Sequence, residues 1–158
     1  MWGSRMQAVL GRHKTLGRTV VVAALAIGLL SFAPGRADAS TSSERAMASY
    51  INSARTNHSR AALRFSDGLS SLARRHSQTM ASQDRLYHNP YLAQWMANWS
   101  WRILGENVGV GPTVYGLHVA FMNSPPHKAN IMDRRFRNVG VGIVSSNGRI
   151  WVTVIFRG

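Results

Sequence analysis

Residues 121–132 read Phe-Met-Asn-Ser-Pro-Pro-His-Lys-Ala-Asn-Ile-Met, and the expected fold is organised around them. Proline lacks a backbone N–H and fixes φ, so it stops a preceding helix but is accepted in the first turn of a new one. The pattern predicts that one helix ends at Ser124 and that another begins at Pro126. The second helix would present His127 in its first turn, and the segment Gly105-Glu106-Asn107-Val108 places a carboxylate upstream.

The C-terminal residues change from a helical to an alternating pattern, which is typical of strands. Apolar residues at 139, 141 and 143 alternate with glycines, and Asn147-Gly148 is a strong signal for a two-residue hairpin turn. Residues 150–156 alternate again, but both faces of this second strand are largely apolar. A strand of that kind has to be covered on both sides. We therefore predict a closing antiparallel hairpin with helices on each face of the sheet.

Apolar residues spaced three and four positions apart predict helices before the hairpin. The first helix should be capped by Ser42 or Ser43 and end near Thr56, and the second should be capped by Ser66 or Asp67. Two further helices are expected, one short helix after Asn89-Pro90 and one capped by Thr113. Helices followed by strands indicate an α+β fold, and we expect a three-layer α-β-α sandwich with an antiparallel sheet.

Some ring side chains fall on the apolar faces of these helices. His76 and His118 are both placed in this way, and a packed core histidine is the favoured interpretation for each. Trp95, Trp99 and Trp101 lie within seven positions of one another. Core packing is favoured for the tryptophans as well, and the alternative is an exposed aromatic platform for a sugar or a lipid.

The first 39 residues have the pattern of a secretory signal peptide. A basic segment precedes an apolar run at Val20–Leu30, and Ala37-Asp38-Ala39 supplies small residues for cleavage. The apolar run is shorter than the roughly 20 residues that a membrane-spanning helix needs. We predict cleavage after Ala39, which leaves one domain at 40–158 that is secreted or associated with the cell envelope. A retained N-terminal anchor is the alternative.

The composition limits the possible chemistry and partners. The chain has no cysteine, which excludes disulfides, cysteine-ligated zinc and thiol catalysis. Its net charge is +13, and residues 40–158 carry 14 Lys and Arg against five Asp and Glu. The basic residues are scattered, so export favours an anionic envelope partner, such as lipid headgroups or wall polymers, over nucleic acid. Peripheral membrane contact fits this charge, and a basic surface with no dedicated partner is the alternative.

Four motifs in order resemble the bacterial branch of the CAP superfamily, also called the SCP domain. That superfamily groups cysteine-rich secretory proteins, antigen 5 proteins and pathogenesis-related proteins. The motifs are Tyr87-His88-Asn89-Pro90, Gly105-Glu106-Asn107-Val108, Met-Asn-Ser-Pro-x-His-x-x-Asn-Ile at 122–131, and Val139-Gly140-Val141-Gly142. The resemblance covers roughly Met47 to Phe156. It implies an α-β-α sandwich whose cleft is lined by two histidines and one or two carboxylates, which in several members hold zinc or another divalent ion.

Carried over by motif, the candidate ligands of Zn²⁺ or another divalent cation are His88, His127 and Glu106, with Ser124 and Asn107 in the same cleft. Imidazoles and carboxylates are ordinary zinc ligands. Residues 118–126 contain no Asp or Glu, so the second acid of the family's full tetrad is missing and weaker metal binding is expected. Alternatively, Glu106 and His127 form a buried hydrogen-bonded pair that only fixes the glycine-rich segment.

The function expected from these features is that of a secreted, monomeric binding module. Lipid or sterol binding is what the resemblance most often implies, and the positive charge adds attraction to anionic membranes or wall polymers. The competing function is a metal-assisted hydrolase of peptide or cell-wall material, with Glu106 as a ligand or a general base. Nucleic-acid binding rests on charge alone and is not expected. Whether the protein is catalytic is left open by the sequence.

Overall fold

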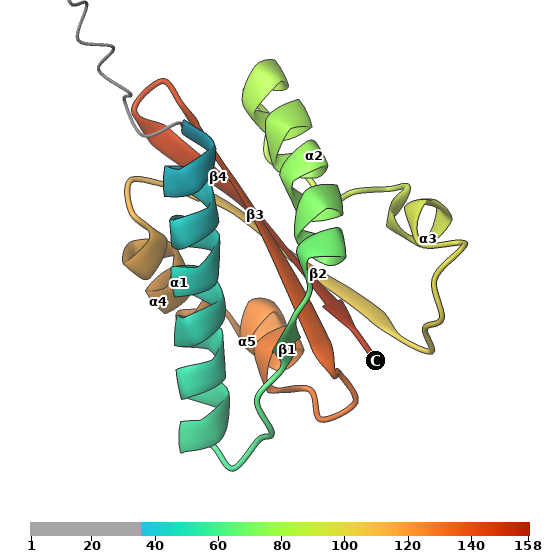
Figure 1. Ribbon diagram of the computed structural model, residues 1–158. Helices are drawn as coiled ribbons and strands as arrows, with labels where there is room; N and C mark the ends of the chain where they lie inside the picture. The colour runs from blue at the N-terminus through green and yellow to red at the C-terminus, as the bar shows by residue number, and fades with distance from the viewer. Residues whose placement is uncertain (1–35) are drawn as a thin grey trace, which may run out of the picture. The chain divides into compact units, whose positions relative to one another are not determined.

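A computed structural model describes residues 36–158 of the chain. The predicted leader lies outside the described residues except for 36–39, which begin the first helix. The elements, shown in Figure 1, are α1 (Arg36–Asn57), β1 (Arg64–Phe65), α2 (Asp67–Gln83), α3 (Leu92–Trp95), β2 (Leu104–Gly111), α4 (Val114–Asn123), α5 (Pro125–Met132), β3 (Asn138–Ser146) and β4 (Arg149–Arg157). None of the helices in this part of the chain is long and apolar enough to cross a membrane.

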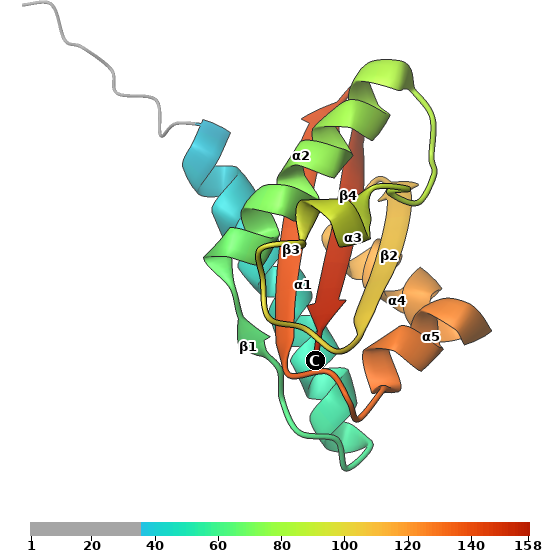
Figure 2. The ribbon, with the colours of Figure 1, turned by 90° about the vertical axis from the view of Figure 1, so that its right-hand side faces the viewer.

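A four-stranded sheet with the strand order β1-β3-β4-β2 forms the middle layer. β4 pairs antiparallel with both β3 and β2, and β2 is an edge strand. α2 and α3 cover one face of the sheet, and α1, α4 and α5 lie on the other, as Figure 2 shows from the side of α2. The predicted three-layer α-β-α sandwich is therefore confirmed.

β4 divides the core in two, because successive side chains of a strand point to opposite faces. Val152, Val154 and Phe156 pack in the core cluster that includes residues of α1, α4 and α5. Trp151 and Ile155 belong to two smaller clusters that include residues of α2. All six residues from 151 to 156 are buried, which confirms that this strand is covered on both sides.

Several local sequence signals are confirmed. The Ser66 side chain caps α2 by accepting from the Leu69 amide, and the Thr113 side chain caps α4 by accepting from the Gly116 amide. The helix break at Ser124 occurs as predicted, with α5 beginning at Pro125. The hairpin turn has positive φ at both of its residues, Asn147 and Gly148, as this turn type requires.

Other local predictions were wrong. α1 already begins at Arg36, so Ser42 and Ser43 lie inside it and neither is its cap. Glu44 also lies inside α1, and its carboxylate is engaged by α2 and β3. No strand was predicted between the first two helices, but this segment contains β1, which forms only through its parallel pairing with the start of β3.

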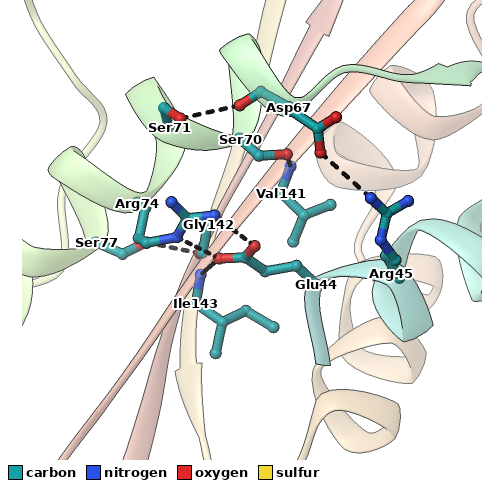
Figure 3. A network of polar contacts seen from close by, with 10 residues as sticks. All are labelled: Glu44, Arg45, Asp67, Ser70, Ser71, Arg74, Ser77, Val141, Gly142 and Ile143. Atoms are coloured by element: carbon teal, nitrogen blue, oxygen red, sulfur yellow. Dashed lines mark hydrogen bonds and ion pairs between the residues drawn. The ribbon is translucent and has the colours of Figure 1, made fainter. Parts of the chain in front are cut away.

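Polar side chains from two helices bond the backbone of β3 beyond its short pairing with β1 (Figure 3). Ser70 accepts from the Val141 amide, and Ser77 donates to the Gly142 carbonyl. Glu44 of α1 accepts from the Ile143 amide at 3.1 Å. These bonds satisfy backbone groups that a buried strand edge would otherwise leave unpaired. Glu44 also pairs with Arg74 through two bonds of 2.8 and 2.7 Å, which connects both helices to the strand.

Candidate functional site

The loop after α2 contacts β2 through His88, Asn89 and Glu106, and we refer to these three residues as the corner. Nδ1 of His88 lies 2.8 Å from Oε1 of Glu106. The backbone amide of Asn89 donates to the same oxygen at 2.9 Å. Glu106 is 6% exposed at its side chain, whereas His88 is 63% exposed. The contact therefore joins a buried carboxylate to an imidazole that faces solvent.

This contact determines the tautomer of His88. An ionised carboxylate can only accept, so the proton of a neutral imidazole has to sit on Nδ1, next to Glu106. The lone pair of Nε2 is then available on an exposed ring. A nitrogen of this kind can accept a hydrogen bond, accept a proton or bind a cation.

Two buried polar atoms in this corner have no hydrogen-bond partner among residues 36–158. They are Oε2 of Glu106, an acceptor, and Nδ2 of Asn89, a donor. The orientation of the Asn89 amide is set by its own oxygen, which accepts from the Tyr91 amide at 2.9 Å. Asn89 is 8% exposed, so both atoms lie in a largely desolvated environment. Buried groups without partners are rare and call for a specific explanation.

His127 lies at the start of α5, where the Ser124-Pro-Pro sequence begins the helix. Its Nδ1 is 2.7 Å from Oγ of Ser124, and its ring lies 5.0 Å from the ring of Phe121. Asn107 donates to the carbonyl of His127 at 3.1 Å and accepts from Asn130 at 2.9 Å. The predicted site residues Ser124 and Asn107 therefore position His127.

The two histidines approach the edge strand β2 from different elements. His88 contacts Glu106, whereas His127 is held through Asn107, and adjacent residues of a strand point to opposite faces. Burial lowers the pKa of His127, and the nearby charge of His88 lowers it further. His88, when it is protonated, therefore opposes the protonation of His127, although the strongest contacts of the two imidazoles are with different residues.

The arrangement does not form a ready-made metal centre. Within residues 36–158, no group of three or more His, Cys, Asp or Glu side chains is placed so that it could hold a metal ion. The alternative of a Glu106–His127 pair does not describe the corner either. In the part of the chain that the structure describes, the hydrogen bonds of the Glu106 carboxylate go to His88 and to the Asn89 amide.

An open groove of about 500 Å³ begins at this corner. Asn89, Pro90 and Leu92 line it on one side, and Trp101 and Arg102 line it on another. Asn89 is thus shared between the groove and the corner, because it lines the groove and its amide bonds to Glu106.

The roles of three residues in this site were not predicted from the sequence. Asn89 was expected only to precede a short helix, but its backbone and side chain are part of the corner. Asn130 donates to the Glu106 carbonyl at 3.0 Å, and thereby holds the edge strand against α5. Phe121 packs against His127. All three residues lie within or beside the motifs that identify the histidines, and this proximity is the signal that could have pointed to them.

The remaining ring residues follow the predictions in part. His76 is buried, and its Nε2 lies 2.8 Å from the Tyr87 carbonyl, so it anchors the loop that carries His88. His118 is buried as expected. Trp95 and Trp99 are half-buried, but Trp101 is 39% exposed, so core packing does not describe the whole tryptophan cluster.

Comparisons with known proteins agree with this fold. The sequence model of the CAP family, described as the cysteine-rich secretory protein family, matches residues 48–156. The uncharacterized protein YkwD of Bacillus subtilis (strain 168) is 31% identical over 115 residues, which are 68% of this chain and 44% of that protein. The chain thus spans less than half the length of this relative.

Two solved structures share the fold at low sequence identity. One is an extracellular protein containing a SCP domain from Bacillus anthracis str. Ames, with a TM-score of 0.67, 20% identity and coverage of 75% of this chain and 41% of that chain. The other is an outer surface protein from Borrelia burgdorferi, with a TM-score of 0.66, 17% identity and coverage of 72% of this chain and 90% of that chain.

The strand order and the helices on both faces of the sheet place the chain in the class of α-β-α sandwich domains of the SCP type. Together with the family match over most of the chain, they identify it as a member of the cysteine-rich secretory protein (CAP) family.

Proposed function

We propose that this protein is a CAP-domain binding module that acts outside the cell or in its envelope, and that the corner of His88, Asn89 and Glu106 binds the polar group of a ligand. The observation that carries the proposal is the buried Oε2 of Glu106, which has no partner among the described residues. Leaving a buried acceptor unsatisfied costs about 1–3 kcal/mol, and more for a charged group. A bound ligand would remove that cost.

The chemistry of the corner favours a hydroxyl group as the part of the ligand that binds there. Oε2 of Glu106 needs a donor, and Nδ2 of Asn89 needs an acceptor. A hydroxyl is the simplest group that provides both. Sterols, which are among the ligands that the family resemblance implies, and the sugars of wall polymers carry hydroxyls. The adjoining groove of about 500 Å³ offers space for the body of such a ligand.

The location outside the cell is supported by two separate observations. The N-terminal residues have the pattern of a secretory signal peptide, and one matched structure is described as extracellular and another as an outer surface protein. The net charge of +13 would attract such a protein to anionic lipids or wall polymers. Peripheral contact with the envelope is therefore part of the proposal, as is a monomeric state.

A divalent cation such as Zn²⁺ is the second candidate occupant. Oε2 of Glu106 and the exposed ring of His88 could supply two donors, with His127 as the third ligand that the resemblance suggests. The described residues form no ready-made three-ligand group, so such an ion would bind more weakly than at a structural zinc site. The competing hydrolase function depends on this ion.

Experiments with the purified protein can distinguish a hydroxyl-bearing ligand from a divalent cation as the occupant. A labelled sterol and its methyl ether are offered in liposomes in the presence of a chelator, and extraction is measured for the natural chain and for Glu106→Gln. The ether cannot donate to Oε2. Extraction of the free sterol but not of its ether, together with loss of that extraction in Glu106→Gln, would support the hydroxyl site. Asp67→Asn changes an exposed carboxylate outside the corner and is the matched control.

Calorimetric titration with Zn²⁺ supplies the opposing test. One-to-one binding that disappears in both His88→Ala and His127→Ala, without selective sterol extraction, would make the cation the occupant. Turnover of peptidoglycan or peptide that is lost in Glu106→Gln would replace the binding module with the hydrolase.

A further inference from the structure

A second groove, of about 880 Å³, lies between the loop before β2 and the segment before β3. Its lining includes Trp99, Trp101, Arg102, Arg135 and Arg137, and we refer to it as the basic-aromatic groove. It combines aromatic faces with guanidinium groups, and it contains none of the residues of the His88–Glu106 corner.

Backbone and side-chain bonds hold the walls of this groove in place. The indole nitrogen of Trp101 donates to the Met96 carbonyl at 3.0 Å, which fixes the ring although it is 39% exposed. The Arg102 amide donates to the Gly158 carbonyl at 2.8 Å, so the loop is tied to the end of the chain. The Arg137 amide donates to the Arg157 carbonyl at 2.8 Å. A binding surface that is already ordered loses less conformational entropy when a ligand binds.

The positive charge of the groove is only partly compensated. Arg135 is paired with Asp133 at 2.7 Å. Among the described residues, no side-chain carboxylate pairs with Arg102 or Arg137, and the Arg137 side chain donates to backbone carbonyls instead. A guanidinium group presents a planar set of donors that matches a carboxylate or a phosphate. Two such groups beside one fixed indole ring form a surface complementary to an anion that also carries a flat apolar face.

The basic-aromatic groove and the groove beside the corner share part of their lining. Trp101, Arg102 and Ile103 line both of them. The groove beside the corner ends at Asn89, whose amide contacts Glu106.

From these observations we propose that the basic-aromatic groove binds an anionic polysaccharide, with a sugar ring on Trp101 and its carboxylate or phosphate groups on Arg102 and Arg137. The proposed function includes an anionic envelope partner but does not say where that partner binds, and the present proposal assigns it a defined surface. It does not depend on the His88–Glu106 corner. A polyanion without sugar rings lacks the flat faces that would stack on the indole, and a neutral glycan lacks the charges.

Calorimetric titration of the full chain with oligogalacturonate at low salt tests the proposal. Neutral malto-oligosaccharide, poly-L-glutamate and a single-stranded oligonucleotide serve as comparison ligands. Oligogalacturonate should bind most tightly, and the affinity should fall in about 0.5 M salt because exposed charges are then screened. The double variant Arg102→Ala/Arg137→Ala should weaken binding at least about tenfold, which corresponds to about 1.4 kcal/mol.

Control variants separate this site from general attraction to a basic protein. Arg64→Ala/Lys128→Ala removes two exposed charges elsewhere and should change the affinity by less than about twofold, or about 0.4 kcal/mol. Trp101→Ala should weaken oligogalacturonate more than poly-L-glutamate, and Trp101→Phe should recover part of the loss. Circular dichroism checks that each variant is folded, and Arg102→Ala keeps the backbone bond to Gly158.

Equal losses in the two double variants would overturn the proposal, because binding would then follow net charge alone. Tighter binding of the oligonucleotide, or equal binding of poly-L-glutamate, would overturn it as well. Glu106→Gln should leave oligogalacturonate binding intact. A failure of sterol extraction would therefore leave this proposal standing, and a failure of oligogalacturonate binding would leave the proposed hydroxyl site standing.

Discussion

His88 and Glu106 are 18 positions apart in the chain, and yet Nδ1 of the first lies 2.8 Å from Oε1 of the second. The same oxygen accepts from the Asn89 amide, whereas Oε2 has no partner among the described residues. The carboxylate is thus fixed in position by one oxygen and left unsatisfied at the other. This asymmetry distinguishes it from Glu44, the other buried carboxylate, whose two oxygens are both hydrogen-bonded.

The two buried carboxylates should respond differently to the same substitution. Glu44→Gln breaks the pair with Arg74, and we expect the free energy of unfolding to fall by about 3 kcal/mol. Glu106→Gln replaces a buried carboxylate oxygen that lacks a partner, so the loss should be less than about 1 kcal/mol. Urea unfolding of both variants measures the difference.

A loss as large in Glu106→Gln as in Glu44→Gln would contradict a ligand-binding role, because Glu106 would then be stabilising the fold itself. Glu106→Ala is a useful additional variant, since it also removes the acceptor of the Asn89 amide and should cost more than Glu106→Gln.

Gly142 allows α2 to pack closely on β3. A Cβ atom at this position would lie 2.0 Å from the backbone nitrogen of Arg74, which cannot move without displacing the helix. Gly142→Ala should therefore cost about 3 kcal/mol or more. Gly148 is the control, because its φ is +70° but a Cβ would meet nothing within 4 Å, so Gly148→Ala should cost only about 1 kcal/mol. Similar unfolding midpoints for the two variants would show that α2 packs less closely than described.

The stability of the protein should decrease in mild acid. Burial lowers the pKa of His118, and its Nδ1 has no hydrogen-bond partner among residues 36–158. Below about pH 6.5 the unfolded chain takes up a proton that folded His118 resists, so stability falls as the pH drops through this range. The lowered pKa of His127 has an effect of the same sign.

His118→Leu should therefore reduce, without abolishing, the stability lost between about pH 7.5 and about pH 5. Urea unfolding at the two pH values measures this loss. An unchanged pH dependence in His118→Leu would mean that other groups cause it.

Features that depend on a few neighbouring residues could be predicted from the sequence. The caps at Ser66 and Thr113, the break at Ser124 and the turn at Asn147-Gly148 each follow from local backbone preferences. β1 could not be predicted, because two residues become a strand only through pairing with β3, more than 70 positions away. The start of α1 was wrong for a related reason: Ser42 can cap a helix, but it is also tolerated inside one.

The candidate site, like the fold, could be predicted from the sequence only in part. The motifs indicated His88, Glu106 and His127, but not that the carboxylate bonds one histidine while Asn107 holds the other. That difference arises because β2 is an edge strand whose adjacent residues point to opposite faces. The roles of Asn89 and Asn130 depend on backbone atoms brought together by the fold, and a sequence pattern does not reveal them.

The most direct test that His127 lies near the His88–Glu106 corner is an NMR titration of the His127 imidazole. The charge of His88 contributes to lowering the pKa of His127, so His88→Ala should raise that pKa. His58→Ala, at an exposed position just after α1, should leave it unchanged. A pKa of His127 that is the same in His88→Ala as in the natural chain would show that the charge of His88 does not reach His127, and it would contradict the account.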